Sequence, residues 1–224
     1  MTISGLGPHG EKAVRADKIV LSETEAAAAR AGGFLIAIVL HTTTSDWARE
    51  ELSGIRASLE AFGANIAEIV DCGFSKEHQN SAMLRLAASD VHAVISIPIG
   101  NSSVAEGHRA VSRAGKTLVL LDNAPTGFQP GQDYTCLVSA DNFGLGAIAA
   151  GLLSPHLPTE GVSGILTYGA DFFEQTTAQL FFNNTPLPAG GVMRIFLTSG
   201  NAFVYGSTTD NRTNDSQIQF TARR

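Results

Sequence analysis

The continuous apolar run at residues 34–40 constrains the fold of this chain more than any other feature. A run without polar alternation predicts a strand that is buried on both faces, as in a parallel sheet covered by helices. Apolar periodicity predicts further strands at 66–70, 91–97, 117–121, 137–139 and 164–167, and helices at 46–62, 76–88, 102–114 and 142–153. Strands that alternate with helices predict an α/β fold with a doubly wound parallel sheet.

The regular pattern divides the chain into four segments. Residues 1–32 are expected to form an N-terminal arm and a short helix, in which Ser22 and Glu25 have the spacing of a capping box. We expect a first lobe at 33–139, the beginning of a second lobe at 140–175, and an irregular tail at 176–224. Only 192–197 and 202–205 suggest short strands in the tail, so we attribute it to truncation or a shifted reading frame. The second lobe is therefore expected to be incomplete.

Composition excludes several classes of function. The net charge of −6 gives no general attraction to nucleic acid or to an anionic membrane. The most apolar run is too short to span a bilayer, and residues 1–10 lack the apolar stretch of a secretory signal, so the chain as written reads as unexported and cytoplasmic. Cys72 and Cys136 have no metal-binding spacing and are expected to be free, although a single disulfide stays open.

Polar and aromatic residues gather directly after the predicted strands. Ligands of doubly wound sheets bind outside the carboxyl ends of the strands. The expected ligand-binding residues are His41, Thr43, Asp46, Trp47, Asp122, Asn123, Ser139, Asp141, Asp171, Phe172 and Phe173. Carboxylates and amides can bind hydroxyl groups, and aromatic faces can cover the C–H face of a sugar ring. The set predicts a site for a small polyhydroxylated ligand.

Each of these residues also has a structural explanation. Thr44 or Ser45 can cap the helix that follows, and Asp46 suits the positive end of the helix dipole. Trp47 can be a core residue, and Asp122 can shape the turn before Pro125.

Motifs of enzymes are weak in this sequence. Neither a nucleophile elbow nor a Walker loop occurs, and the six histidines do not pair at metal-binding spacing, so neither a metal nor a cofactor is expected. We expect His92 inside a strand, and His78 and His108 on helix surfaces. Residues 144–149 fit the dinucleotide pattern Gly-x-Gly-x-x-Ala, but no acidic residue ends the next strand.

Several segments in order resemble one family. Asp122 and Asn123 follow an apolar strand, and residues 138–142 precede a helix rich in glycine and alanine. Together they resemble the sugar-type periplasmic substrate-binding proteins of ABC transporters, similar to ribose-binding proteins. Residues 8–12, Asp46 and Trp47 after the first strand, and residues 170–173 look like one bacterial branch of that family. The resemblance covers residues 8 to 175.

The resemblance implies a type I periplasmic-binding-protein fold in which two lobes close on one sugar-like ligand. It implies a periplasmic monomer that delivers its ligand to a membrane permease, without enzymatic activity and without nucleic acid as a partner. Asp122 and Asn123 would bind hydroxyl groups beside the hinge, Ser139 and Asp141 would lie at the crossover, and residues 171–173 would contact the ligand from the second lobe. Two alternatives are the ligand-sensing core of a sugar-responsive transcription regulator and a Rossmann-type nucleotide-dependent enzyme.

Overall fold

The computed structural model describes residues 6–153, 162–167, 192–197 and 217–221. Residues 6–140 form one compact unit, and the described residues from 141 onward belong to another. Three of the predicted site residues, Asp171, Phe172 and Phe173, lie outside the described residues, as does the strand suggested for 202–205. The four-segment division of the chain stays a prediction.

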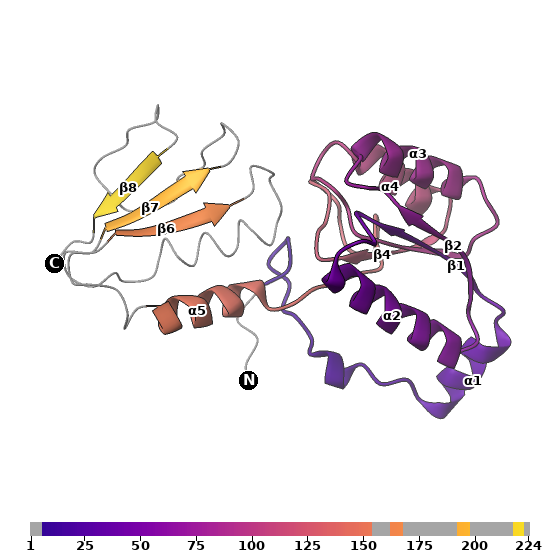
Figure 1. Cartoon of the computed structure of the whole chain (residues 1–224). Coiled ribbons are helices and arrows are strands. Elements are labelled where there is room, and N and C mark those ends of the chain that lie inside the picture. Colours follow the sequence, from indigo (N-terminus) through magenta and orange to yellow (C-terminus); the bar gives the residue numbers. More distant parts are fainter. Residues whose placement is uncertain (1–5, 154–161, 168–191, 198–216, 222–224) are drawn as a thin grey trace. The chain divides into compact units, whose positions relative to one another are not determined.

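A five-stranded parallel sheet forms the centre of the first unit (Figure 1). Its strands are β1 (Leu35–Leu40), β2 (Asn65–Asp71), β3 (Ala93–Ser96), β4 (Thr117–Leu121) and β5 (Cys136–Val138). The strand order is β2-β1-β3-β4-β5, and every pairing is parallel. The predicted doubly wound parallel sheet is therefore confirmed in this unit.

Three of the four helices of this unit begin at a serine cap, and the last three helices connect successive strands. The helices are α1 (Glu23–Ala31), α2 (Asp46–Ala61), α3 (Lys76–Ala87) and α4 (Ala105–Arg113), and a 3-10 turn, η1, occupies Ala16–Lys18. Ser22 and Glu25 form the predicted capping box of α1, and Ser45 and Ser75 cap α2 and α3. Helix α4 begins three residues later than predicted, because residue 102 still belongs to a turn in which Ala105 N–H binds the Ser102 carbonyl.

Both faces of the sheet are covered, which explains the uninterrupted apolar run of β1. Ile38 and Leu40 face α2, where Leu52 and Ile55 pack against the same cluster. Ala37 and Val39 point to the opposite face, where Met83 of α3 and Val111 of α4 close a second cluster. Figure 1 shows α2 on one side of this sheet and α3 with α4 on the other. Side chains on both faces of β1 are thus buried, as the sequence predicted.

The second unit contains helix α5 (Asn142–Leu153) and a three-stranded sheet. Its strands are β6 (Val162–Thr167), β7 (Val192–Leu197) and β8 (Gln217–Thr221). β6 pairs with β7 in parallel, and β7 pairs with β8 antiparallel. β8 was not predicted, because its five residues are too short a run to stand out in a polar tail; it pairs with β7, with Ile195 opposite Ile218.

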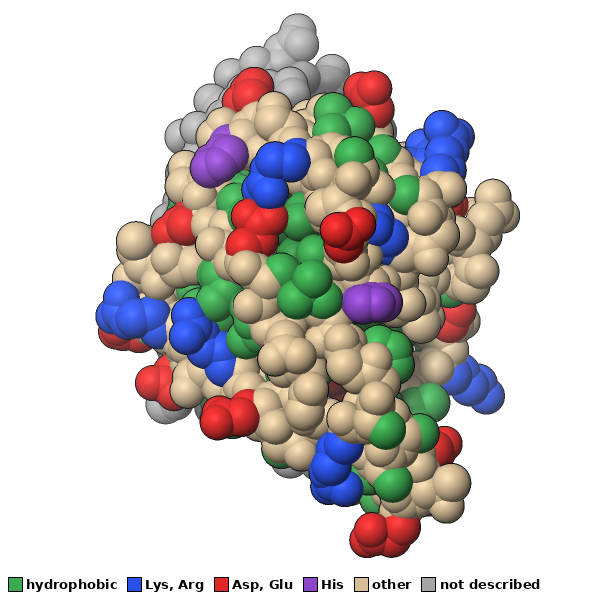
Figure 2. Space-filling model, turned by 90° about the vertical axis from the view of Figure 1, so that its right-hand side faces the viewer, with side chains coloured by type: hydrophobic (Ala, Val, Ile, Leu, Met, Phe, Trp, Pro, Cys, Tyr) green, Lys and Arg blue, Asp and Glu red, His purple; other side chains and the backbone are tan. Residues whose placement is uncertain are grey.

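The described surface has mixed charge. Figure 2 shows one face of the molecule, where acidic and basic side chains are interspersed rather than gathered by sign. Among the described residues, no helix has the length and apolar character that crossing a membrane requires.

Candidate functional site

The loop after β1 places His41 between two aromatic side chains at the carboxyl edge of the sheet. The His41 ring centroid lies 5.1 Å from that of Phe74 and 5.9 Å from that of Trp47. Phe74 follows β2 in a left-handed conformation with φ of 60°, and its side chain is exposed. Trp47 is 52% exposed, so its alternative role as a core residue is wrong. The three rings form what we call the aromatic bracket: His41, Trp47 and Phe74.

The imidazole of His41 has a polar atom without a partner. Its Nδ1 is buried and neither donates nor accepts a hydrogen bond. Burial lowers the pKa of His41, and the nearby carboxylate of Asp71 opposes this only in part. The ring is therefore neutral at pH 7, and a neutral imidazole offers one donor and one acceptor. A ligand hydroxyl can satisfy either.

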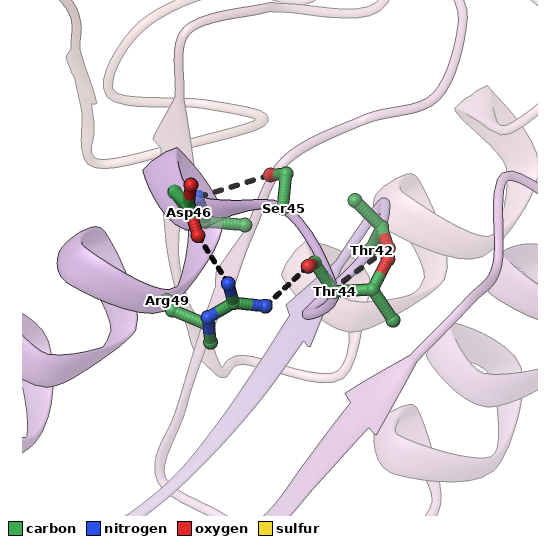
Figure 3. A network of polar contacts seen from close by, with 6 residues as sticks. Thr42, Thr44, Ser45, Asp46 and Arg49 are labelled. Atoms are coloured by element: carbon green, nitrogen blue, oxygen red, sulfur yellow. Dashed lines mark hydrogen bonds and ion pairs between the residues drawn. The ribbon is translucent and has the colours of Figure 1, made fainter.

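The rest of the β1 loop is held by internal hydrogen bonds. The Thr43 backbone N–H and hydroxyl donate to Asp71 Oδ2 over 3.1 Å and 2.5 Å. The Thr42 and Thr44 hydroxyls are hydrogen-bonded over 2.9 Å, and Figure 3 shows the two side chains turned toward one another. Thr43 thus holds the loop to Asp71, which is the last residue of β2 and is not among the predicted site residues.

Asp46 is bound to its own helix. Its carboxylate pairs with Arg49, whose guanidinium also donates to the Thr44 carbonyl (Figure 3). The Asp46 side chain is 94% exposed and lies in the first turn of α2. This arrangement matches the structural explanation, with Ser45 as the cap and Asp46 at the positive helix end. A ligand contact of Asp46 stays a prediction.

Asp122 lies at the end of β4 with its carboxylate turned to Ser139. The Ser139 hydroxyl donates to Asp122 Oδ1 over 3.2 Å, so the structure brings these two predicted residues together. Asp122 has a φ of 56°, which confirms its role in shaping the turn. Burial raises the pKa of Asp122, and the Ser139 hydrogen bond lowers it in part.

Glu51 of α2 is a candidate that the sequence reasoning missed. Its Oε2 is buried without a hydrogen-bond partner. Burial and then the negative charge of Asp122 raise the pKa of Glu51 to about 7. A signal was present in the sequence, because Glu51 stands four residues after Trp47 and therefore on the same helix face. The strand-end rule could not find it, since Glu51 lies one turn inside a helix.

Asn123 has a structural role in the described residues. Its side chain is only 2% exposed, and its amide donates to the Pro98 carbonyl over 3.4 Å. The loop after β3 that it contacts carries Asn101, whose Oδ1 is buried without a partner. Asn101 is thus a second missed candidate, in a loop that directly follows a strand.

The loop after β3 is fixed from α3 by Gln79. This fully buried side chain donates to the Ile97 carbonyl and accepts from the Ile99 N–H, both over 2.8 Å. A glutamine in this position supplies the two hydrogen bonds that the loop backbone lacks once it leaves the sheet. Gln79 therefore positions the edge on which Asn101 lies.

Asp141 belongs to the second unit and begins α5. Its Oδ1 accepts a hydrogen bond from Gly144 N–H over 2.9 Å. The glycines of the dinucleotide pattern, Gly144 and Gly146, lie inside α5 rather than in a loop before it. A carboxylate thus occupies the helix N-terminus where a pyrophosphate would bind, which weighs against the nucleotide-binding alternative.

Two expectations about histidines are corrected. His108 is fully buried rather than on a helix surface, with its ring nitrogens bound to the Val104 carbonyl and the Ser96 hydroxyl over 2.8 Å and 3.0 Å. Burial lowers the pKa of His108 to about 4. His92 lies one residue before β3, and its Nδ1 accepts from Leu35 N–H over 3.0 Å. His78 is exposed on α3, as expected.

Both cysteines are free, as predicted, with Cys72 buried and Cys136 exposed. Within the residues that the structure describes, no group of three or more histidine, cysteine or acidic side chains could hold a metal ion.

Comparison with known proteins supports the fold through solved structures. No family model matches the chain, and no curated protein matches it. Solved structures do match. A galactofuranose-binding protein aligns with a TM-score of 0.58 and 18% identity over 68% of this chain and 53% of its own.

Two further structures give the same result. The periplasmic binding protein of an arabinose ABC transporter from a Shewanella species, bound to L-arabinofuranose, aligns with a TM-score of 0.58 and 15% identity over 66% of this chain and 49% of its own. A carbohydrate transporter solute-binding protein from Chloroflexus aurantiacus, in complex with D-glucose, aligns with a TM-score of 0.58 and 19% identity. The alignment covers 70% of this chain and 47% of that protein. The chain shares the type I periplasmic-binding-protein fold. The match spans about half the length of these proteins.

Proposed function

We propose that this chain binds a small polyhydroxylated solute, such as a sugar, as the solute-binding component of an ABC importer. One observation carries the proposal. Three of the buried polar side-chain atoms without a partner, His41 Nδ1, Glu51 Oε2 and Asn101 Oδ1, belong to the edge that also carries the aromatic bracket. The shared fold supports it, because the similar structures are sugar-binding proteins, two of them from transporters.

Elementary energetics explain why unpartnered atoms favour this function. A buried polar group without a hydrogen bond costs about 1–3 kcal/mol. A solute rich in hydroxyl groups satisfies several such atoms at once, since each hydroxyl both donates and accepts. The apolar faces of Trp47 and Phe74 suit the C–H face of a sugar ring.

The experiment is a ligand titration read by intrinsic fluorescence. Trp47 is the single tryptophan of the chain and belongs to the aromatic bracket, so its emission reports on the site directly. Pentoses, hexoses, polyols, ATP and NAD are titrated in parallel, and thermal shift provides an independent readout. Saturable binding of a neutral sugar is expected; binding of a nucleotide alone would contradict the proposal.

Two variants localise the response. Asp122→Ala is expected to abolish sugar binding, because it removes the carboxylate that Ser139 orients toward the edge. Asp90→Ala is the matched control, since Asp90 is exposed and lies in the loop before β3, at the opposite edge of the sheet. Equal affinity of both variants would remove Asp122 from the site.

The same proposal includes a periplasmic location, a permease as partner, a monomeric state and no catalysis. The sugar is expected to be recovered chemically unchanged after prolonged incubation with the protein. Size-exclusion chromatography with light-scattering detection, with and without sugar, measures the molar mass and so tests the monomeric state. Reconstitution with a candidate permease and its ATPase tests delivery, with sugar-dependent ATP hydrolysis as the expected result.

A further inference from the structure

Glu51 stands apart from the other acidic residues of α2. Its Oε2 is buried without a partner, whereas its neighbour Glu50 is exposed. One helical turn separates Glu51 from Trp47, so both side chains leave the same face of α2. The negative charge of Asp122 at the end of β4 acts on Glu51, which places the two carboxyl groups near one another at the ligand-binding edge.

Resting on the proposed sugar-binding function, we propose that Glu51 is a specificity-determining residue. Glu51 Oε2 accepts a hydrogen bond from a ligand hydroxyl, and the Glu51–Asp122 pair excludes sugars that carry a carboxylate. The site thus takes neutral sugars and rejects uronic acids.

The chemistry follows from the groups present. An ionised carboxylate only accepts hydrogen bonds, and sugar hydroxyls are donors that match it. A ligand carboxylate would instead add a third negative group to a partly buried pair, where charge repulsion is weakly screened. The Ser139 hydroxyl donates a hydrogen bond to Asp122 but carries no charge that would offset this repulsion.

Protonation of Glu51 should make the discrimination against uronates depend on pH. Because the pKa of Glu51 is raised to about 7, its carboxyl is largely neutral at pH 6 and largely ionised at pH 8. A protonated carboxyl repels a uronate less than an ionised one does. Rejection of uronates should therefore strengthen as pH rises from 6 to 8, while both uronates and neutral sugars keep their own charge over this range.

Paired sugars provide the test. Wild-type protein is titrated with D-glucose and D-glucuronate, and with D-galactose and D-galacturonate, at pH 6 and pH 8, using Trp47 fluorescence and calorimetry. We expect the neutral sugar of a pair to bind at least about tenfold more tightly than its uronate at pH 8, with a smaller ratio at pH 6. Glu51→Gln keeps the shape and removes the charge, so its ratio should be smaller and independent of pH. Glu50→Gln is the matched control and should behave as wild type.

The outcomes separate the two proposals. If neither the neutral sugars nor the uronates bind, the proposed function fails and the role of Glu51 fails with it. If a neutral sugar binds but Glu51→Gln leaves the ratio and its pH dependence unchanged, only the role of Glu51 is overturned. Glu51→Ala provides a second variant should Glu51→Gln unfold, and it should lose affinity for the neutral sugar as well.

Discussion

Thr43 donates two hydrogen bonds to a single carboxylate oxygen of Asp71, one from its backbone N–H and one from its hydroxyl. The two residues lie at the ends of adjacent strands, since Asp71 is the last residue of β2 and pairs with Leu40, the last residue of β1. A third link joins the same loops, because Phe74 N–H donates to the His41 carbonyl over 2.8 Å. These contacts fix His41 and Phe74 of the aromatic bracket relative to one another before any ligand arrives.

Replacing Asp71 should therefore weaken binding without touching the ligand. Asp71→Asn loses the charge that strengthens both Thr43 hydrogen bonds, and sugar affinity should fall by about three- to tenfold. Hydrogen bonds lower the pKa of Asp71, with the Thr43 hydroxyl as the largest cause. Its stabilisation is thus present above the unfolded pKa of about 3.8 and is lost as pH falls through the lower folded value.

Melting temperatures across pH 2 to 7 measure this effect. Wild type should melt above Asp71→Asn at pH 7, and the two curves should converge in acid. Asp90→Asn, at an exposed position on the opposite edge, should follow wild type throughout. A gap between wild type and Asp71→Asn that persists unchanged at pH 2 would contradict the role given to the carboxylate.

Gln79 should be a large contributor to stability. Gln79→Leu removes the partners of the Ile97 carbonyl and the Ile99 N–H, which stay buried. Each unpaired group costs about 1–3 kcal/mol, so the free energy of unfolding should fall by roughly 2–5 kcal/mol in urea titrations. His78→Ala, one residue away and exposed, should change it by less than about 0.5 kcal/mol. Equal stability of Gln79→Leu and His78→Ala would refute the role of Gln79 in holding the loop after β3.

Periodicity predicted the fold because burial repeats along the chain. Every residue of β1 from Ile36 onward is buried, so the apolar run carried the signal for a parallel strand without any distant information. Caps were predictable for the same reason, since Ser22 and Ser45 act on residues three positions away. β8 escaped prediction because its strand character depends on pairing with β7.

The site was predictable only in part. The strand-end rule found His41 and Asp122, whose positions follow from chain order, and the structure confirms that the parallel strands bring such residues to one edge. It could not show that Asn123 turns inward to bind Pro98, or that Asp46 pairs with Arg49. Glu51 was missed because the burial of its Oε2 depends on how α2 packs in the folded protein, which local sequence does not specify.

His108 should titrate far below an ordinary histidine. Burial lowers its pKa from 6.5 to about 4. Between these pH values His108 is protonated in the unfolded chain but neutral in the folded protein. The contribution of neutral His108 to the free energy of unfolding is therefore complete above pH 6.5 and is lost as pH falls toward 4. NMR of the imidazole Cε1 protons should show one ring that stays neutral down to about pH 4. A His108 resonance titrating near pH 6.5 in folded protein would refute its burial.

The two thiols should differ strongly in reactivity. Cys72 is 2% exposed, and burial raises its pKa to about 11, whereas Cys136 lies exposed on the edge strand β5. Iodoacetamide at pH 8 reacts with thiolates that it can reach, so it should label Cys136 first. Labelling of Cys72 requires local opening and should be slower on the order of a hundredfold or more. Mass spectrometry should show one label in native protein and two in urea, and none in native Cys136→Ser. Equal rates at both thiols would show that the face of the sheet under α3 opens readily.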